Sequence, residues 1–254
     1  MPVQRRTASS GARLGCRSIY RLECGPRFDW MPILDTTPHA RTPKQRRSRE
    51  SYERMIEGAV EILREKGLEG LTLSEVSRRS HVSIGSIYCR VQSKEHLLRE
   101  VQARVLREME HEFAMLVNRV RRRMLPLREL VPVLVRELAL YLRRHAVLLN
   151  SFMQQAQRDD HMAVEGRRSY SQAMLDFKLL LLEHQAEFGH PDPERATSAC
   201  FIIVYGTLAR YLGLGAIPGE HSGAGEGDWK QLVEDLGLMA LAFLTARQPI
   251  HAGR

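Results

Sequence analysis

The apolar pattern constrains this chain most, because from Ser48 onward it has the period of an α-helix. In the first such stretch, apolar residues recur three and four positions apart, with Glu and Arg between them: Met55, Ile56, Ala59, Val60 and Leu63. No convincing pair of strands follows. The 254 residues allow one large domain or two smaller ones. The sequence therefore predicts an all-α fold.

Capping signals divide residues 48–95 into short helices. Gly67 is a suitable end for the first helix, because glycine tolerates the left-handed conformation. Thr72 and Glu75 form a capping box that opens a second helix, which ends near Ser80. After a tight turn, Ser83 caps a third helix of sequence SIGSIYCRV, and Ser93 caps a fourth. Short second and third helices joined by a tight turn predict a helix-turn-helix DNA-binding domain over residues 48–95.

The third helix carries the side chains that a major-groove helix needs. Small residues let the backbone approach DNA, Ile84 can touch a thymine methyl group, and Arg90 can reach a guanine edge or a phosphate. Tyr88 can donate a hydrogen bond to a phosphate. The full predicted DNA-binding set is Thr72, Ser83, Ile84, Gly85, Ser86, Tyr88, Arg90 and Lys94, with Arg46 and Arg47 reaching toward the minor groove. The alternatives are a generic surface turn for the third helix and a solvated charge pair for the two arginines.

Residues 72–98, TLSEVSRRSHVSIGSIYCRVQSKEHLL, resemble the DNA-binding segment of TetR-type transcriptional regulators. The matching features are the threonine that opens the second helix, the Val82–Ser83 turn, Gly85, Tyr88 and the Ser-Lys-Glu-x-Leu-Leu opening of the fourth helix. Two positions depart from the pattern, because Val91 stands where the family usually has Phe and Cys89 where an aromatic or polar residue is common. The resemblance is specific over residues 48–100; beyond them it rests on an all-helical pattern alone.

Residues 96–247 form a second, larger helical region, predicted as an effector-binding and dimerisation domain. An apolar run over residues 127–142 contains Pro132, so its helix either starts near Val131 or kinks at the proline. Further helices are predicted over 146–157, 167–188, 193–214 and 228–245, the last two opened by Asp192 and Asp228. Residues 216–227 contain four glycines and are predicted to be a loop.

The resemblance implies that the last two helices form a dimer face and that the middle helices enclose a pocket for a small-molecule effector. The predicted dimer residues are Phe201, Leu208, Leu212, Leu236, Met239 and Phe243, and the alternative is that they fill the core of a monomer. The predicted pocket residues are Phe152, Met153, Met174, Phe177 and Tyr205, each of which is equally consistent with plain core.

Most of the formal net charge of +8 lies in residues 1–47, which hold ten Lys/Arg and three Asp/Glu. These residues lack periodicity and contain five prolines, so we expect a disordered basic arm. Such an arm contacts DNA phosphates or is simply a solvated tail. A transit peptide is a further reading, and Met31 is an alternative start. Residues 48–100 hold nine charges of each sign, so phosphate affinity there depends on local placement.

Other classes of protein lack support in the sequence. The four cysteines form no CxxC pair and no histidine lies at metal-ligand spacing, so no metal site or cofactor is expected. No nucleophile–base arrangement or phosphate-binding glycine loop suggests an enzyme. The longest apolar stretch, residues 199–209, is too short to span a bilayer, so no membrane partner is expected. We expect a cytoplasmic chain with reduced cysteines.

The expected function is a ligand-responsive repressor that binds a palindromic double-stranded operator as a homodimer. Two alternatives remain: a nonspecific DNA binder that acts through the basic arm, and a helical small-molecule-binding protein whose helix-turn-helix is incidental.

Overall fold

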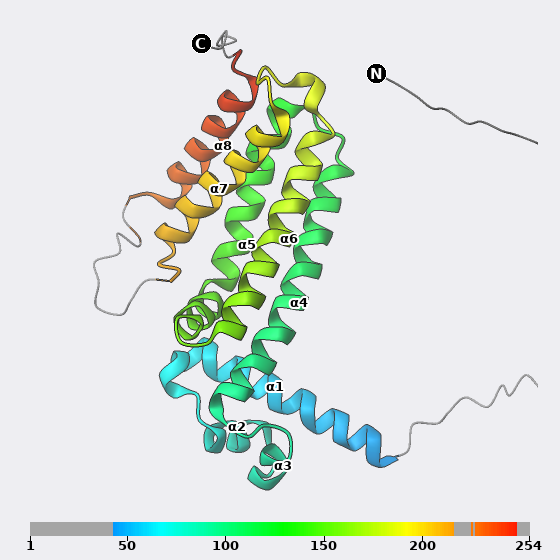
Figure 1. Ribbon diagram of the computed structural model, residues 1–254, viewed down its shortest axis with the longest axis vertical. Coiled ribbons are helices and arrows are strands. Elements are labelled where there is room, and N and C mark those ends of the chain that lie inside the picture. The colour runs from blue at the N-terminus through cyan, green and yellow to red at the C-terminus, as the bar shows by residue number, and fades with distance from the viewer. Residues whose placement is uncertain (1–42, 216–224, 226, 248–254) are drawn as a thin grey trace, which may run out of the picture. The chain divides into compact units, whose positions relative to one another are not determined.

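The computed structural model describes residues 43–215, 225 and 227–247. Over these residues the chain forms eight α-helices, one short 3₁₀ turn and no strand, which confirms the all-α prediction (Figure 1). The helices are α1 Pro43–Gly70, α2 Leu73–Ser80, α3 Ile84–Tyr88, α4 Lys94–Arg121, α5 Leu127–Ala156, α6 Asp160–Leu182, α7 Pro193–Tyr211 and α8 Trp229–Thr245. The 3₁₀ turn covers Gln185–Glu187.

The predicted caps of the first helices are present. The hydroxyls of Thr72, Ser83 and Ser93 each accept a hydrogen bond from the backbone N–H three residues on, at 3.1, 3.3 and 3.2 Å. Gly67 interrupts α1 with φ 63° and ψ −164°, a backbone conformation that disfavours side chains with a Cβ. Only the hydroxyl half of the predicted capping box forms, because the Glu75 carboxylate is bonded to Lys66 and Arg78 instead.

The N-terminal boundary differs from the prediction. Helix α1 begins at Pro43, so residues 43–47 belong to a helix and not to an extended arm. Proline suits the first helical position, where its missing N–H has no partner to lose. The rest of the predicted arm, and the alternative start at Met31, lie outside the described residues.

The larger part of the described chain is a helical bundle. Helix α4 follows α3 after five residues and runs 28 residues into this bundle, where it packs against α5 and α6. Helix α5 also packs against α8, and α7 packs against both α6 and α8 (Figure 1). One continuous core joins the N-terminal helices to the bundle. It runs from Ile62 in α1 and Ile87 in α3 to Leu134 in α5 and Phe201 in α7.

Two helices of the bundle correct the prediction. Helix α5 is continuous over 30 residues, so the expected break between residues 142 and 146 is wrong. The polar residues there do not end the helix, because Arg144 and His145 both contact Glu112 of α4. Helix α6 starts at Asp160, seven residues before the predicted Arg167, because the Asp159 carboxylate caps it through Met162 N at 3.3 Å.

Most of the predicted glycine-rich loop, residues 216–227, lies outside the described residues. Within the part of the chain that the structure describes, no helix combines the length and the apolar character that a membrane crossing requires.

Candidate nucleic-acid interface and adjoining cavity

The turn between α2 and α3 has a fixed geometry. His81 ends α2 in the left-handed conformation, with φ 53° and ψ 33°. The Ser77 hydroxyl then donates a 2.7 Å hydrogen bond to the Val82 carbonyl, which joins α2 to the turn. Val82 and Ile87 are buried beneath the turn and beneath α3. The opposite side of α3 consequently faces solvent.

The exposed side of α3, with its cap Ser83, unites five of the ten predicted DNA-binding residues. Ile84 is 39% exposed and Tyr88 56% exposed, and Ser83, Gly85 and Ser86 are exposed as well. The Ser83 and Ser86 hydroxyls lie 2.8 Å apart. A Cβ added to Gly85 would meet no atom within 4 Å, so this side of the helix is open to a close approach. The arrangement suits a helix that presents small and uncharged side chains to base edges.

Arg90 and Lys94 both form hydrogen bonds to α1. The Arg90 guanidinium donates to the Ser48 carbonyl at 2.5 Å and to the Ser48 hydroxyl at 2.9 Å, and it lies over the Tyr52 ring at 5.7 Å from the centroid. The Lys94 ammonium donates to the Leu68 carbonyl at 2.9 Å. Both cations therefore tie the α3–α4 segment to α1. The contacts that the sequence predicts between these two cations and DNA remain predictions.

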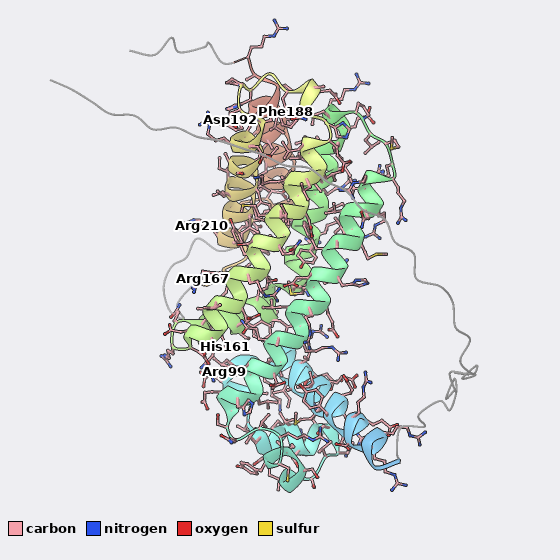
Figure 2. The ribbon with its side chains drawn as sticks, turned by 45° about the vertical axis from the view of Figure 1, so that its right-hand side comes forward. Arg99, His161, Arg167, Phe188, Asp192 and Arg210 are labelled. Carbon is pink, nitrogen blue, oxygen red and sulfur yellow. The ribbon has the colours of Figure 1, made fainter. Side chains whose placement is uncertain are left out.

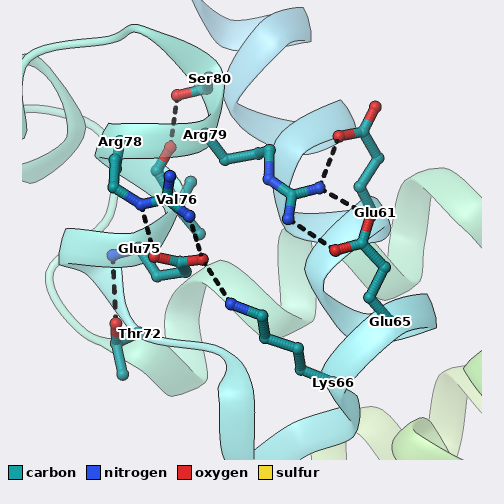
Figure 3. Close-up of polar contacts among 9 residues, drawn as sticks. All are labelled: Glu61, Glu65, Lys66, Thr72, Glu75, Val76, Arg78, Arg79 and Ser80. Atoms are coloured by element: carbon teal, nitrogen blue, oxygen red, sulfur yellow. Dashed lines mark hydrogen bonds and ion pairs between the residues drawn. The ribbon is translucent and has the colours of Figure 1, made fainter.

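The charges of α2 are paired with one another and with α1 (Figure 3). The Glu75 carboxylate accepts hydrogen bonds from Arg78 and from Lys66, and these bonds lower its pKa to about 2. Arg79 donates to Glu65 at 2.6 Å and to Glu61 at 3.3 Å. Thr72 remains exposed at the start of α2, where its hydroxyl hydrogen can be donated to a phosphate.

The predicted minor-groove pair begins α1. Arg46 and Arg47 are exposed, and the Arg46 guanidinium lies 3.4 Å from the Glu50 carboxylate one turn further on. An exposed pair of this kind contributes little to stability. Both arginines therefore remain available for a phosphate, but on a helix and not on an extended segment.

A cavity of about 490 Å³ lies among α4, α5 and α6. The predicted residues Phe152, Met153 and Tyr205 line it. Phe177 does not, because it is fully buried and packs on Phe201 with ring centroids 5.4 Å apart, and Met174 packs against the core outside the cavity. Sequence reasoning missed the contributions of α4 and α6, which include Gln102, Leu106, Met109, Ala163, Gly166 and Arg167.

Two of the polar side chains that line the cavity, Gln102 and Tyr141, are hydrogen-bonded to the backbone. The buried Gln102 amide donates to the Met162 carbonyl at 3.0 Å, and the Tyr141 hydroxyl donates to the Met109 carbonyl at 3.0 Å. Burial raises the pKa of Tyr205 to about 12 and also raises the pKa of Tyr141, so both phenols stay neutral. Most of the residues that line the cavity are nevertheless apolar.

The predicted dimer face needs correction. Phe201, Leu208 and Leu236 are buried within the protomer, so they fill its core and cannot meet a partner. Leu212 and Phe243 are half-buried, and Met239 is 62% exposed. The exposed large apolar residues of α7 and α8 are Ile202, Ile203, Leu238 and Met239.

Comparison with known proteins finds a family match for one segment of the chain and a shared fold for most of it. Residues 55–101 match the model of the bacterial regulatory proteins of the tetR family, which confirms the resemblance noted above. No protein of curated function matches the chain. Solved structures share its fold at low sequence identity.

Three such structures illustrate the likeness. A protein from Mesorhizobium loti, described as a TetR-family transcriptional regulator, has a TM-score of 0.63 and 16% identity over 78% of this chain and 96% of that chain. A bacterial regulatory protein in the tetR family from Rhodococcus has a TM-score of 0.53 and 14% identity over 77% and 97%. The fatty acid degradation regulator FadR from Bacillus halodurans has a TM-score of 0.51 and 18% identity over 75% and 94%.

Proposed function

We propose, from the premise that residues 55–101 are the DNA-binding segment of a tetR-family transcriptional regulator, that this chain is a homodimeric, ligand-responsive repressor of a palindromic operator. The single observation that carries the proposal is the exposed side of α3, where small and uncharged residues surround Gly85 above a buried core.

Sequence reading belongs to α3 in this proposal. With α3 in the major groove, Ile84 contacts a thymine methyl group and Ser83 and Ser86 bond to base edges. Tyr88 donates to a phosphate from one end of α3, and Thr72 does so from the start of α2. Arg90 and Lys94 contribute indirectly, because their hydrogen bonds hold α3 and the start of α4 on α1.

Dimerisation through α7 and α8 follows from their exposed apolar residues. Ile202 and Ile203 on α7 are 54% and 53% exposed, and Leu238 and Met239 on α8 are 61% and 62% exposed. Adjacent exposed apolar residues of this kind mark interaction sites. A two-fold pairing of this face presents two copies of α3 to half-sites about one helical turn apart, which is why the operator is expected to be palindromic.

Ligand response requires a physical connection between the cavity and α3, and α4 supplies one. Five residues separate the end of α3 from the start of α4, and Gln102, Leu106 and Met109 of α4 line the cavity. Near its start, Arg99 bonds to the Asp159 carboxylate at 2.8 Å, and Gln102 bonds to the Met162 carbonyl. A ligand that shifts α6 against α4 therefore acts on the element that holds α3. The effect of ligand on DNA affinity must then equal the effect of DNA on ligand affinity.

The test is selection of DNA from a random pool by the purified full chain at near-physiological salt. We expect a palindrome with half-sites about one turn apart. The same selection is carried out with the Ser86→Ala variant, because this substitution removes a hydroxyl from the exposed side of α3 and leaves the core unchanged. A changed base preference in this variant supports the reading surface. Recovery of no motif, together with binding that vanishes as salt rises, would instead indicate nonspecific binding.

A further inference from the structure

The cavity owes its space to small side chains on one face of α6. Ala163, Gly166 and Ala173 line it, while the facing residues of α4 and α5 are large and apolar: Leu106, Met109, Leu142, Leu149, Phe152 and Met153. A Cβ added to Gly166 would meet no atom within 4 Å. The lining residues of α6 run from Met162 to Tyr170 and Ala173, which corresponds to about 16 Å along the helix axis. The space therefore suits an elongated body.

The chemistry of the wall selects an apolar body. None of the lining residues is an acid, a lysine or a histidine. The Gln102 amide and the Tyr141 hydroxyl already donate to backbone carbonyls. A ligand gains about 0.8 kcal/mol for each methylene that it buries against such a wall. A polar body would lose more hydration here than the few remaining polar side chains of the wall, such as Ser169 and Tyr205, can replace.

Arg167 is the one charged residue among those that line the cavity. It is exposed, so it stands where the cavity opens to solvent, and Figure 2 shows it on α6. Its neighbour Arg168 lies 3.1 Å from both Glu165 and Glu110. Arg167 has no such carboxylate among the described residues. Its guanidinium is therefore available to an anionic group on a ligand, and it can form a charge-assisted hydrogen bond.

We propose that the cavity binds a single-headed amphiphile, with an elongated apolar body among α4, α5 and α6 and one anionic group at Arg167. A carboxylate and a phosphate monoester share this chemistry. The proposal rests on the proposed function only in taking the cavity as the effector site. Binding itself is measurable without DNA.

The probes are four compounds with the same twelve-carbon chain: dodecanoate, dodecyl phosphate, 1-dodecanol and dodecyltrimethylammonium. Each is titrated below its micellar concentration into the full chain by calorimetry. We expect a 1:1 complex in which an anionic probe binds about tenfold more tightly than the alcohol, and in which the cation binds least. The better of the two anionic probes identifies the head group as a carboxylate or a phosphate.

Three variants locate the interaction. Arg167→Gln should bring the affinity for the anionic probe down to that for the alcohol and leave the affinity for the alcohol unchanged. Arg210→Gln is the matched control, because Arg210 is exposed on α7 (Figure 2) but does not line the cavity, and it should retain the preference. Gly166→Leu fills the space and should abolish binding of all four probes. Leucine favours a helix over glycine, so this variant keeps its fold.

The proposal is overturned if no probe binds the wild-type chain, if the alcohol binds as tightly as both anions, or if Arg167→Gln keeps the preference. DNA affinity is measured separately with the selected operator. A probe that binds as described but leaves DNA affinity unchanged supports this ligand class and contradicts the ligand-responsive part of the proposed function.

Discussion

Ile203 provides the sharpest test of the dimer. It lies on α7, about half of its side chain is exposed at 53%, and Ile202 beside it is exposed to the same extent. Nothing within the described protomer requires an isoleucine on the solvent side of this helix. If α7 and α8 pair with a second copy, the exposed half of Ile203 is buried there.

The expected magnitude follows from the exposed fraction. Full burial of an isoleucine side chain contributes about 1.5–3 kcal/mol, so the exposed half contributes about 1 kcal/mol in each copy. A two-fold interface contains the residue twice, which gives about 2 kcal/mol. Ile203→Ser should therefore weaken the dimer about 30-fold. Ile203→Asp should weaken it further, because a carboxylate then loses water at the interface.

Sedimentation equilibrium over a series of protein concentrations measures the dimer constant of each variant. Val164→Asp is the control, because Val164 is 52% exposed but lies on α6. Circular dichroism and thermal unfolding establish that each variant is folded. A dimer constant that stays at the wild-type value in Ile203→Asp refutes the assignment of this face. An equal loss in Val164→Asp would mean that charge alone, and not position, disturbs association.

Three further predictions concern the helix-turn-helix and its connection to the helical bundle. Arg90→Ala should lower affinity for all DNA sequences alike, by about tenfold, because it releases α3 from α1 without removing a base contact. Competition binding with operators altered at single positions measures this effect. A collapse of base discrimination would contradict the prediction. Tyr88→Phe should likewise weaken binding to all sequences similarly in the same assay, since its hydroxyl is assigned to phosphate. Asp159→Asn should cost about 1 kcal/mol of unfolding free energy at pH 7, because it loses the charge that faces Arg99. Its hydrogen bond from Arg99 holds the pKa of Asp159 below the usual range, so this contribution is present above about pH 4 and is lost as pH falls through the lowered pKa. Urea unfolding at pH 7 and pH 3 should accordingly show a smaller difference between variant and wild type at pH 3, and an equal difference contradicts the ionic origin.

Local signals could be read from the sequence because their causes lie within four residues. Asp192 and Asp228 accept hydrogen bonds from Arg195 N and Gln231 N, at 3.0 and 2.7 Å, as their positions before the helices predicted. The three-residue spacing of a cap is visible in the chain itself. The same holds for the helix-turn-helix, whose caps and turn follow one another within about twenty residues.

The inner and outer sides of α7 could not be read in this way. The helix is apolar over much of its circumference, so periodicity does not separate Phe201, which is fully buried, from Ile202 and Ile203. What separates them is the position of neighbouring helices, since Phe201 meets Phe177 and Tyr170 of α6. The contribution of α6 to the cavity escaped prediction for a related reason. Ala163 and Gly166 are visible as small residues, but the space beside them depends on what lies opposite.

Long cationic side chains are the hardest to assign from sequence, and Arg90 and Lys94 explain why. Each can reach DNA or a neighbouring helix, and its choice depends on acceptors 42 and 26 residues away in the chain, Ser48 and Leu68. Helix α3 itself, IGSIY, contains no charged residue, so its exposed side consists of uncharged side chains. Its contacts then supply base preference but release few counterions. The salt dependence of operator binding must therefore come from cations outside α3. Arg46 and Arg47 at the start of α1 are exposed cations of this kind.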